Sequence, residues 1–224
     1  MIFDPVYIMF MAPALALSLW ANWRVKANFK KYSSIRCSRG MTGAEAAAEL
    51  LSKAGITDVK IVPTEGKLSD HYNPLTKTLA LSKEVYNSSS IAAIGIAAHE
   101  AGHALQHAQH YMPLWIRSVL VPTANFGSSI GYFVMIIGLV MSSTNMVFLG
   151  AFLFSAVLLF QIVTLPVEFN ASSRAKSLIV EYGIISSEEQ VGINRILNSA
   201  ALTYVAAAVS TLLTLLYFLM RARR

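Results

Sequence analysis

Long apolar blocks alternate along this chain with shorter segments of mixed polarity. Four blocks are each long enough to cross a bilayer as a helix: residues 5–23, 117–141, 146–166 and 201–220. A membrane helix needs about 20 mainly apolar residues, so the pattern predicts four transmembrane helices. Only a short Ser/Thr/Asn link near residues 142–145 separates the second block from the third. This link predicts an antiparallel membrane hairpin.

The segment after the first block, residues 24–116, has the mixed composition of a small folded domain. Thr42 and Glu45 have the spacing of a capping box, which predicts the start of an alanine-rich helix. We expect that helix to end near Gly55. Residues 58–62 have the pattern of a β-strand.

A hairpin and a buried helix are predicted in the second half of this segment. Asn73-Pro74 is a turn signal, and the partial alternation of residues 76–82 predicts the strand that follows the turn. The Ser-rich stretch at residues 87–90 can cap a helix over about 90–109. The first turns of that helix are apolar nearly all round, which predicts burial.

Composition and charge agree with a membrane protein. Hydrophobic residues make up 55% of the 224 residues and charged residues only 13%, which is too apolar for an ordinary soluble domain. The net charge is +6, but the basic residues flank apolar blocks rather than form one basic face. We therefore expect no nucleic-acid binding and attribute the charge to the membrane surface.

Basic residues also predict the orientation of the first span. The ones that follow it are Arg24, Lys26, Lys30, Lys31, Arg36 and Arg39. The positive-inside rule places this cluster, and with it residues 24–116, on the cytoplasmic side. Four crossings would then put the arginines of residues 221–224 outside, against the same rule, so the orientation of the last span stays open.

One motif in the predicted buried helix carries chemistry, the HExxH sequence His99-Glu100-x-x-His103. Its histidines lie one turn apart on one helical face, so both imidazoles can reach the same cation. Zinc binds two imidazoles and a carboxylate and keeps one position for water. Glu100 can serve as the general base on that water. The alternative is a pair of structural histidines beside a paired glutamate.

The third metal ligand has to come from elsewhere in the chain. His107 continues the helical face, but its backbone lies about 12 Å along the axis from His99 at 1.5 Å per residue. Three such side chains cannot converge on one ion. The extended metzincin pattern requires glycine at Gln106 and histidine at Gln109, so this chain does not match it.

Glu168 is the better candidate, because the membrane hairpin returns the chain to the side of the HExxH helix. Its alternative role is to favour the dipole of a following helix from the N-terminus. The weaker candidates lie in a solvated polar stretch: Glu181, Glu188 and Glu189. The predicted ligands of a Zn²⁺ cofactor are therefore His99, His103 and Glu168.

Three segments in this order resemble the YugP-type neutral zinc metallopeptidases of bacteria: DHY-x-P-x-TKTL-x-LS, HEAGHALQH and LPVEF-x-AS-x-RA. The similarity runs over nearly the whole chain. More distantly, the chain resembles the HtpX and Ste24 membrane proteases, whose third ligand is the Glu of an E-x-x-x-D segment. The resemblance implies zinc binding by His99, His103 and Glu168, with Glu100 as the base of a gluzincin-like metalloendopeptidase.

The chain departs from these relatives at two positions. The Asp of E-x-x-x-D falls at Ser172, and Asn170 stands where the YugP-like pattern usually has Asp. In the relatives that Asp orients a ligating histidine, and Asn170 or Ser172 can make a neutral version of the hydrogen bond. The candidate donors to the oxyanion of the tetrahedral intermediate are His71, Tyr72 and Arg174.

The strand before the HExxH helix is a candidate for substrate binding. An exposed edge strand can hold an extended peptide by β-augmentation. The residues that would do so are Lys77, Thr78, Leu79, Ala80 and Leu81. The alternative for the same segment is an ordinary core strand.

Together these features predict a mainly α integral membrane protein of about four transmembrane helices. It also has a small α+β zincin-like catalytic domain that carries the HExxH helix and a short β-hairpin. The expected segments are a transmembrane anchor (1–23), the catalytic domain (24–116), a transmembrane hairpin (117–166), a polar helical segment with the third ligand (167–200) and a C-terminal transmembrane helix (201–224).

The expected function is that of a zinc endopeptidase in the bacterial plasma membrane. It would cleave membrane-associated or misfolded polypeptides from the cytoplasmic side, with a role in membrane protein quality control. One alternative is an intramembrane site-2-type protease, but the motif precedes the second span and the third span lacks the Asp-Gly of that class. The other is a non-catalytic scaffold with a vestigial metal site, against which the intact Glu100 argues.

Overall fold

The computed structural model describes residues 5–223, which form two compact units. Among these residues, unit 1 comprises 5–22, 113–166 and 202–223, and unit 2 comprises 23–112 and 167–201. The predicted segments 24–116 and 167–200 thus fall almost entirely within one unit. The long helices of the chain pass from one unit into the other: α1 (Pro5–Ser33), α7 (Thr144–Glu181) and α8 (Ser187–Ala222).

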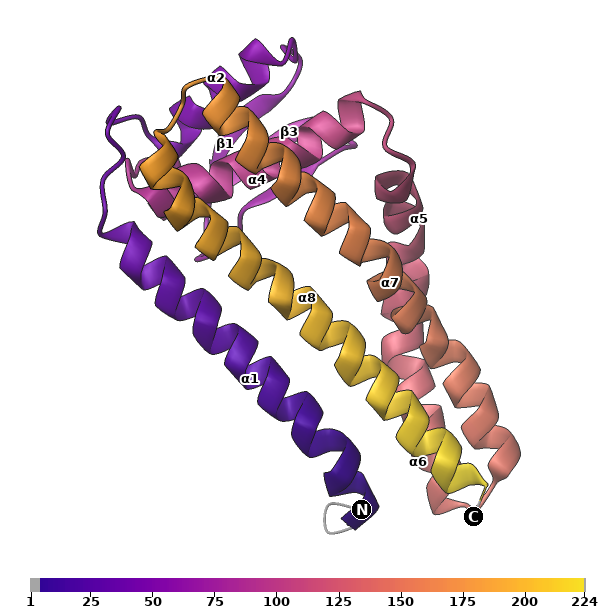
Figure 1. The fold of residues 1–224 in the computed structure, drawn as a ribbon. Helices are drawn as coiled ribbons and strands as arrows, with labels where there is room; N and C mark the ends of the chain where they lie inside the picture. The colour runs from indigo at the N-terminus through magenta and orange to yellow at the C-terminus, as the bar shows by residue number, and fades with distance from the viewer. Residues whose placement is uncertain (1–4, 224) are drawn as a thin grey trace. The chain divides into compact units, whose positions relative to one another are not determined.

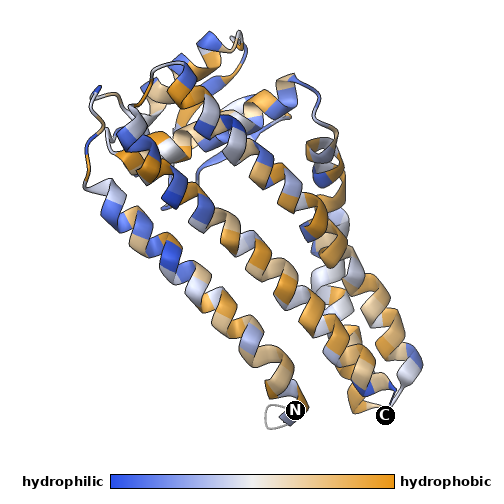
Figure 2. Ribbon diagram, in the orientation of Figure 1, coloured by the Kyte–Doolittle hydropathy of each residue, from blue (hydrophilic) through white to orange (hydrophobic). Residues whose placement is uncertain are grey.

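The described chain contains four helices that are long and apolar enough to be the predicted spans. The stretches apolar enough to cross a membrane are Pro5–Ser33, Met112–Val140, Thr144–Glu181 and Ser187–Ala222. The second is continuous through α5 (Met112–Phe126), the π-helical turn η1 (Gly127–Gly131) and α6 (Tyr132–Val140) (Figure 1). The helices run beyond the apolar blocks, and Figure 2 shows polar residues in these extensions.

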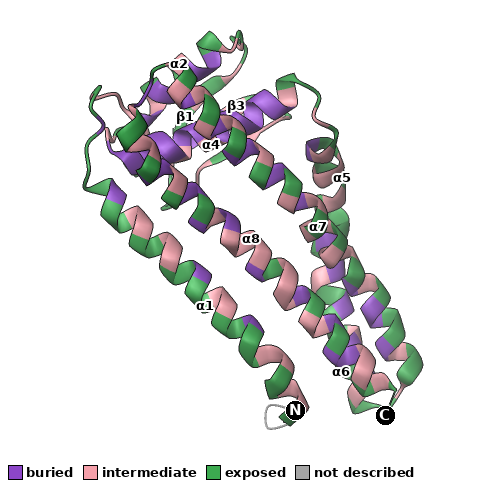
Figure 3. Ribbon diagram, viewed as in Figure 1, coloured by how far each residue is buried: buried purple, intermediate pink, exposed green. Residues whose placement is uncertain are grey.

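Many large apolar side chains on the helices of unit 1 are exposed, although others, among them Met135 and Phe154, form a small buried cluster. Phe133, Val140 and Phe152 are 63%, 73% and 75% exposed, and Figure 3 shows exposed positions all along these helices. Burying apolar surface is worth about 25 cal/mol per Å², so a water-facing surface of this composition is unfavourable. Lipid is the environment that fits it.

Glycines bring the two helical stretches of the predicted hairpin into close contact within unit 1. A Cβ added to Gly131 would lie 2.6 Å from the Phe154 amide nitrogen, and one on Gly150 would lie 2.5 Å from that of Met135. Small residues permit such backbone contacts between membrane helices. The contacts run in opposite chain directions, which confirms the antiparallel hairpin.

After the end of α1, unit 2 contains a helix that the sequence predicted well. Helix α2 (Gly43–Lys53) starts at the expected capping box: Glu45 N–H donates to the Thr42 hydroxyl at 3.2 Å, and Thr42 N–H donates to the Glu45 carboxylate at 2.8 Å. Gly55 follows the helix end with a φ of +75°, a conformation that glycine adopts without strain. The prediction for this helix is therefore confirmed at both ends.

The sheet of unit 2 decides between the two alternatives for residues 77–81, an exposed substrate strand and an ordinary core strand, in favour of the core strand. Its order is β1-β3-β2, from β1 (Lys60–Thr64), β2 (His71–Asn73) and β3 (Thr78–Ser82). Strand β3 pairs in parallel with β1 and antiparallel with β2, so it is central rather than an edge. The residues proposed to bind substrate, Lys77, Thr78, Leu79, Ala80 and Leu81, therefore precede or form a core strand.

Burial and an end contact explain why β3 has no free edge. Leu79 and Leu81 are fully buried, and Ala80 and Ser82 on the opposite face of the strand are buried as well. Just before the start of β2, the Asp70 carboxylate accepts hydrogen bonds from the Ser82 N–H and hydroxyl at 2.8 and 3.1 Å. The backbone donors of β3 that a substrate strand would need are thus already paired with neighbouring strands or with the Asp70 carboxylate.

Helix α4 (Ile91–Ala108) lies at the centre of the unit 2 core, close to the predicted range of residues 90–109. It packs on α2, on the short helix α3 (Lys83–Tyr86), and on β2 and β3. Ala97, Ala98 and Ala101 are fully buried. Their small side chains let the surrounding elements approach the helix that carries the HExxH motif.

Candidate metal centre

The backbone of α4 is ordered by its own cap and by burial. The Ser90 hydroxyl accepts a hydrogen bond from the Ala93 N–H at 3.2 Å and so satisfies one of the free donors at the helix N-terminus. The regular helix then places His99 and His103 on one face, with ring centroids 4.8 Å apart. Two imidazoles therefore point toward a common position without any distortion of the helix.

His99 and His103 meet Glu168 of α7 within unit 2, and the candidate ligand atoms all lie within 4.8 Å of one another. Nε2 of His99 lies 3.1 Å from a Glu168 carboxylate oxygen, and Nε2 of His103 lies 3.6 Å from the same oxygen. Ligands about 2.1 Å from a tetrahedral zinc ion are about 3.4 Å apart. The spacing and the donor types of these residues therefore fit Zn²⁺.

The position of Glu168 rules out the alternative role considered for it. Helix α7 runs unbroken from Thr144 to Glu181, so no helix begins near residue 168. Only 2% of the Glu168 side chain is exposed. A buried carboxylate in mid-helix needs compensating positive charge, and two imidazoles with a bound cation would provide it.

The electrostatics of the cluster favour positive charge. Burial acts to lower the pKa of His103, but the hydrogen bond and charge of Glu168, with the charge of Glu100, outweigh burial and raise it. The two carboxylates thus stabilise positive charge on or next to the His103 imidazole. A metal ion could take the place of that proton.

Glu100 is buried next to the cluster but is not one of its three candidate ligands. Only 8% of Glu100 is exposed. Its carboxylate nevertheless makes no hydrogen bond to any residue in the range 5–223. It also stands outside the three-residue ligand cluster. A buried carboxylate that makes no hydrogen bond to the described residues is free to accept one from water or from a substrate.

Gly102 allows α4 to contact the helix that carries Glu168. A Cβ at this position would lie 2.5 Å from the carbonyl oxygen of Ala171, which is far inside van der Waals contact. The main chain of α4, which carries the two histidines, therefore packs directly on the main chain of α7, which carries Glu168. The separation of the ligands depends on this backbone contact.

We expect Gly102→Ala to lower both stability and zinc affinity, because α4 and α7 must separate to admit the methyl group. Overpacking of this kind typically costs about 1–3 kcal/mol. Thermal unfolding in detergent and zinc titration would measure the two effects. Gly95→Ala is the matched control: it lies on the same helix, and its Cβ would meet only the Ile193 side chain, at 3.3 Å. Equal zinc affinity in the two variants would contradict the expectation.

Ser172 lies where the sequence predicted, at the outer nitrogen of a ligand. Its hydroxyl is 3.1 Å from Nδ1 of His99. Asn170 instead receives hydrogen bonds from Gln106 and Arg174, and the Arg174 guanidinium also bonds to Gln109. Arg174 is therefore engaged beside the cluster and makes no hydrogen bond to its three residues within the described chain.

Gln106 is the residue at this site that the sequence predictions missed. Its side chain is fully buried and bonds to Nδ1 of His103. Residues three apart meet on a helix surface, so the spacing from His103 was a signal. Its other partners lie on α7, which the local sequence of α4 does not reveal.

The other candidate donors are held away from the ligand cluster. His71 is exposed and pairs through Nδ1 with the Ser69 carbonyl at 2.8 Å. The Tyr72 hydroxyl lies 2.8 Å from Nδ1 of His107. Neither His71 nor Tyr72 hydrogen-bonds to a cluster residue within the described chain, and His107 is likewise not part of the cluster.

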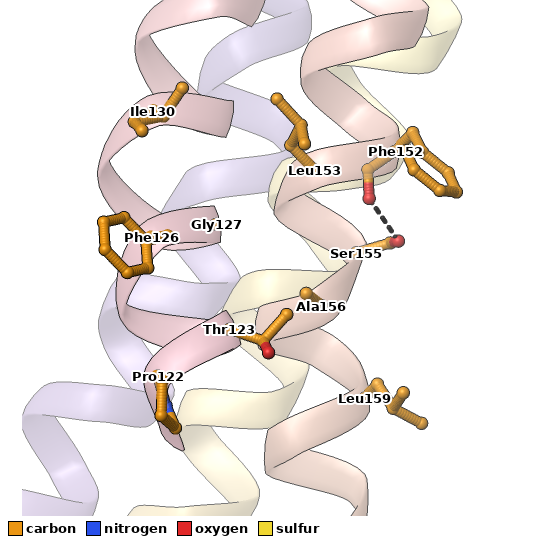
Figure 4. Close-up of a pocket in the computed structure, with 10 residues that line it drawn as sticks. All are labelled: Pro122, Thr123, Phe126, Gly127, Ile130, Phe152, Leu153, Ser155, Ala156 and Leu159. Carbon is orange, nitrogen blue, oxygen red and sulfur yellow. Dashed lines mark hydrogen bonds between the residues drawn. The ribbon is translucent and has the colours of Figure 1, made fainter. Parts of the chain in front are cut away.

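A separate hollow in unit 1 is not a metal site. This apolar groove of about 560 Å³ lies between α5–η1 and α7 (Figure 4). It is lined by Pro122, Thr123, Phe126, Gly127, Ile130, Phe152, Leu153, Ser155, Ala156 and Leu159. The Ser155 hydroxyl donates to the Phe152 carbonyl at 2.6 Å, and none of these side chains is a strong metal ligand or a base.

Comparison with known proteins points to the same chemistry as the cluster. A family model described as "Putative neutral zinc metallopeptidase" matches residues 7–223. The chain is 47% identical over 215 residues to a Bacillus subtilis (strain 168) protein named "Putative membrane protease YugP", and the match covers 96% of each chain. No solved structure matches significantly.

Proposed function

Because the chain belongs to the neutral zinc metallopeptidase family, we propose that it is a membrane-bound endopeptidase that hydrolyses peptide bonds at the His99–His103–Glu168 centre. The observation that carries the proposal is the meeting of two imidazoles and a buried carboxylate, beside a second buried carboxylate that makes no hydrogen bond to the described residues. Family membership supports zinc as the metal.

The chemistry divides between the ligands and the base. His99, His103 and Glu168 would hold the ion, which when bound supplies a Lewis acid for the scissile carbonyl and the attacking water. Glu100 accepts a proton from that water and delivers it to the leaving amine. The burial of its carboxylate beside the cluster, free of hydrogen bonds to the described residues, supports this role.

We infer that an extended substrate pairs with β2 rather than with β3. Strand β3 has partners on both sides, whereas β2 ends the sheet on its outer side. Of the two outer strands in the described sheet, β2 is the one that packs against α4. A peptide added to the edge of residues 71–73 would therefore run beside the helix that carries the motif.

We propose the bacterial plasma membrane as the location and the cytoplasmic side for unit 2. The four membrane-length helices and the membrane-protease relative support a membrane protein. The basic residues from Arg24 to Arg39 support the orientation through the positive-inside rule. Membrane-associated or misfolded polypeptides are the proposed substrates, consistent with a role in membrane protein quality control. Helix α4 is not among the four membrane-length helices, which disfavours intramembrane proteolysis.

Metal removal tests the proposed function directly. We expect the full-length protein in detergent to cleave casein or a quenched fluorescent peptide, to lose this activity on treatment with a chelator, and to regain it when zinc is restored to one equivalent. A chelator-treated sample without added zinc is the control. Cleavage that continues at its full rate after the metal has been removed would reject the proposal.

A further inference from the structure

Gln106 is buried in α4 with every polar atom of its amide engaged. Its Oε1 lies 3.0 Å from Nδ1 of His103. Its Nε2 lies 2.8 Å from the carbonyl oxygen of Val167 and 3.0 Å from Oδ1 of Asn170. This single side chain therefore joins a candidate ligand of α4 to the main chain and a side chain of α7.

The orientation of the Gln106 amide follows from the donors and acceptors around it. The Arg174 guanidinium can only donate, and its Nε lies 2.6 Å from Asn170, so the facing Asn170 atom must be the oxygen. That oxygen and the Val167 carbonyl both accept, so the Gln106 atom between them must be its NH₂ group. Oε1 of Gln106 consequently faces His103 and requires a proton there.

The geometry points to Gln106 as a positioning residue that holds the proton of His103 on Nδ1, a role that rests on the proposed zinc function. An imidazole with its proton on Nδ1 presents the lone pair of Nε2. Nε2 of His103 is the nitrogen that faces Glu168, at 3.6 Å. Gln106 thus selects the tautomer of His103 that can bind a metal.

The other histidine is held by a less selective partner. Ser172 lies 3.1 Å from Nδ1 of His99, but a hydroxyl can donate or accept. It therefore adapts to either tautomer. His103 is therefore the imidazole whose proton position is fixed. A chain of hydrogen bonds from Arg174 through Asn170 and Gln106 fixes it.

The test uses the full-length protein in detergent with histidine ring nitrogens labelled with ¹⁵N. In the zinc-loaded wild type, NMR is expected to show the His103 proton on Nδ1. Gln106→Leu is expected to weaken zinc binding, measured by competition with a chromophoric chelator, by about 10- to 100-fold, and to remove the hydrogen-bonded Nδ1–H signal. Gln106→Glu keeps the oxygen that faces Nδ1 of His103 but replaces the donor to Val167 and Asn170 with a second oxygen, so it is expected to retain the Nδ1–H signal with reduced stability.

Gln190→Leu is the matched control, because Gln190 also donates from Nε2 to an α7 carbonyl, that of Lys176, at 3.2 Å. It is expected to bind zinc like the wild type. A wild-type His103 with its proton on Nε2, or wild-type affinity and spectrum in Gln106→Leu, would overturn the role of Gln106. Zinc binding by the His99→Ala variant with wild-type affinity would instead reject the proposed metal centre. The two failures are therefore distinguishable.

Discussion

Replacement of Glu100 by glutamine is expected to abolish peptide hydrolysis while zinc stays bound. Glu100 lies outside the ligand cluster and is buried beside it. Glutamine has almost the same volume but cannot accept the proton of the attacking water. General base catalysis contributes about 10²- to 10⁴-fold to the rate. The kcat/KM for a fluorescent peptide should therefore fall by about 100-fold or more. Zinc content, measured by atomic absorption, should not change.

Glu181→Gln is the matched control for this change. Glu181 is an exposed glutamate at the end of α7, so the same substitution there should leave both rate and zinc content unaltered. A scaffold with a vestigial site would show no hydrolysis in the wild type either. Hydrolysis by the Glu100→Gln variant at the wild-type rate would remove Glu100 from the mechanism.

Glu168→Ala is expected to eliminate stoichiometric zinc binding and, with it, all activity. The substitution removes the only charged group among the three candidate ligands and leaves two neutral imidazoles to hold the cation. We expect the zinc affinity to fall by more than about 100-fold, beyond the range typical of residues that only support a ligand. Chelator competition on the purified protein would measure the change.

A second carboxylate serves as the control for Glu168. Glu188 is exposed in the first turn of α8, and Glu188→Ala should retain the wild-type zinc affinity. Glu168→Gln should lie close to Glu168→Ala, because an amide oxygen is a weak zinc ligand. Full zinc occupancy in Glu168→Ala would require a third ligand from another residue and would reject the proposed set.

The parts of the fold that were predictable are those specified by local sequence. Run length and composition were sufficient for the four membrane-length helices. The side chains of Thr42 and Glu45 satisfy the first donors of α2 directly, so their spacing identified the helix start. Helix α4 followed from an apolar run behind a serine cluster. In each case the interactions that form the element lie within a few residues.

The features that were hard to predict depend on partners that are distant in the sequence. The central place of β3 depends on its parallel pairing with β1, and a hairpin pattern gives no sign of such a partner. The role of Gln106 depends on Val167 and Asn170, which are 61 and 64 residues away. The pairing of His99 with Glu168 spans 69 residues, and it was inferred only because the intervening membrane hairpin suggested a return of the chain.

The order of the ligands along the chain has a consequence for biosynthesis. The ribosome produces the HExxH helix first, then two apolar stretches, and only then Glu168. At about 5–20 residues per second, several seconds of translation separate the first ligand from the last. During that interval the nascent chain has a base and two imidazoles but no third ligand. Maturation of the proposed protease is thereby coupled to completion of its membrane hairpin, and a chain interrupted before residue 168 lacks the full metal centre.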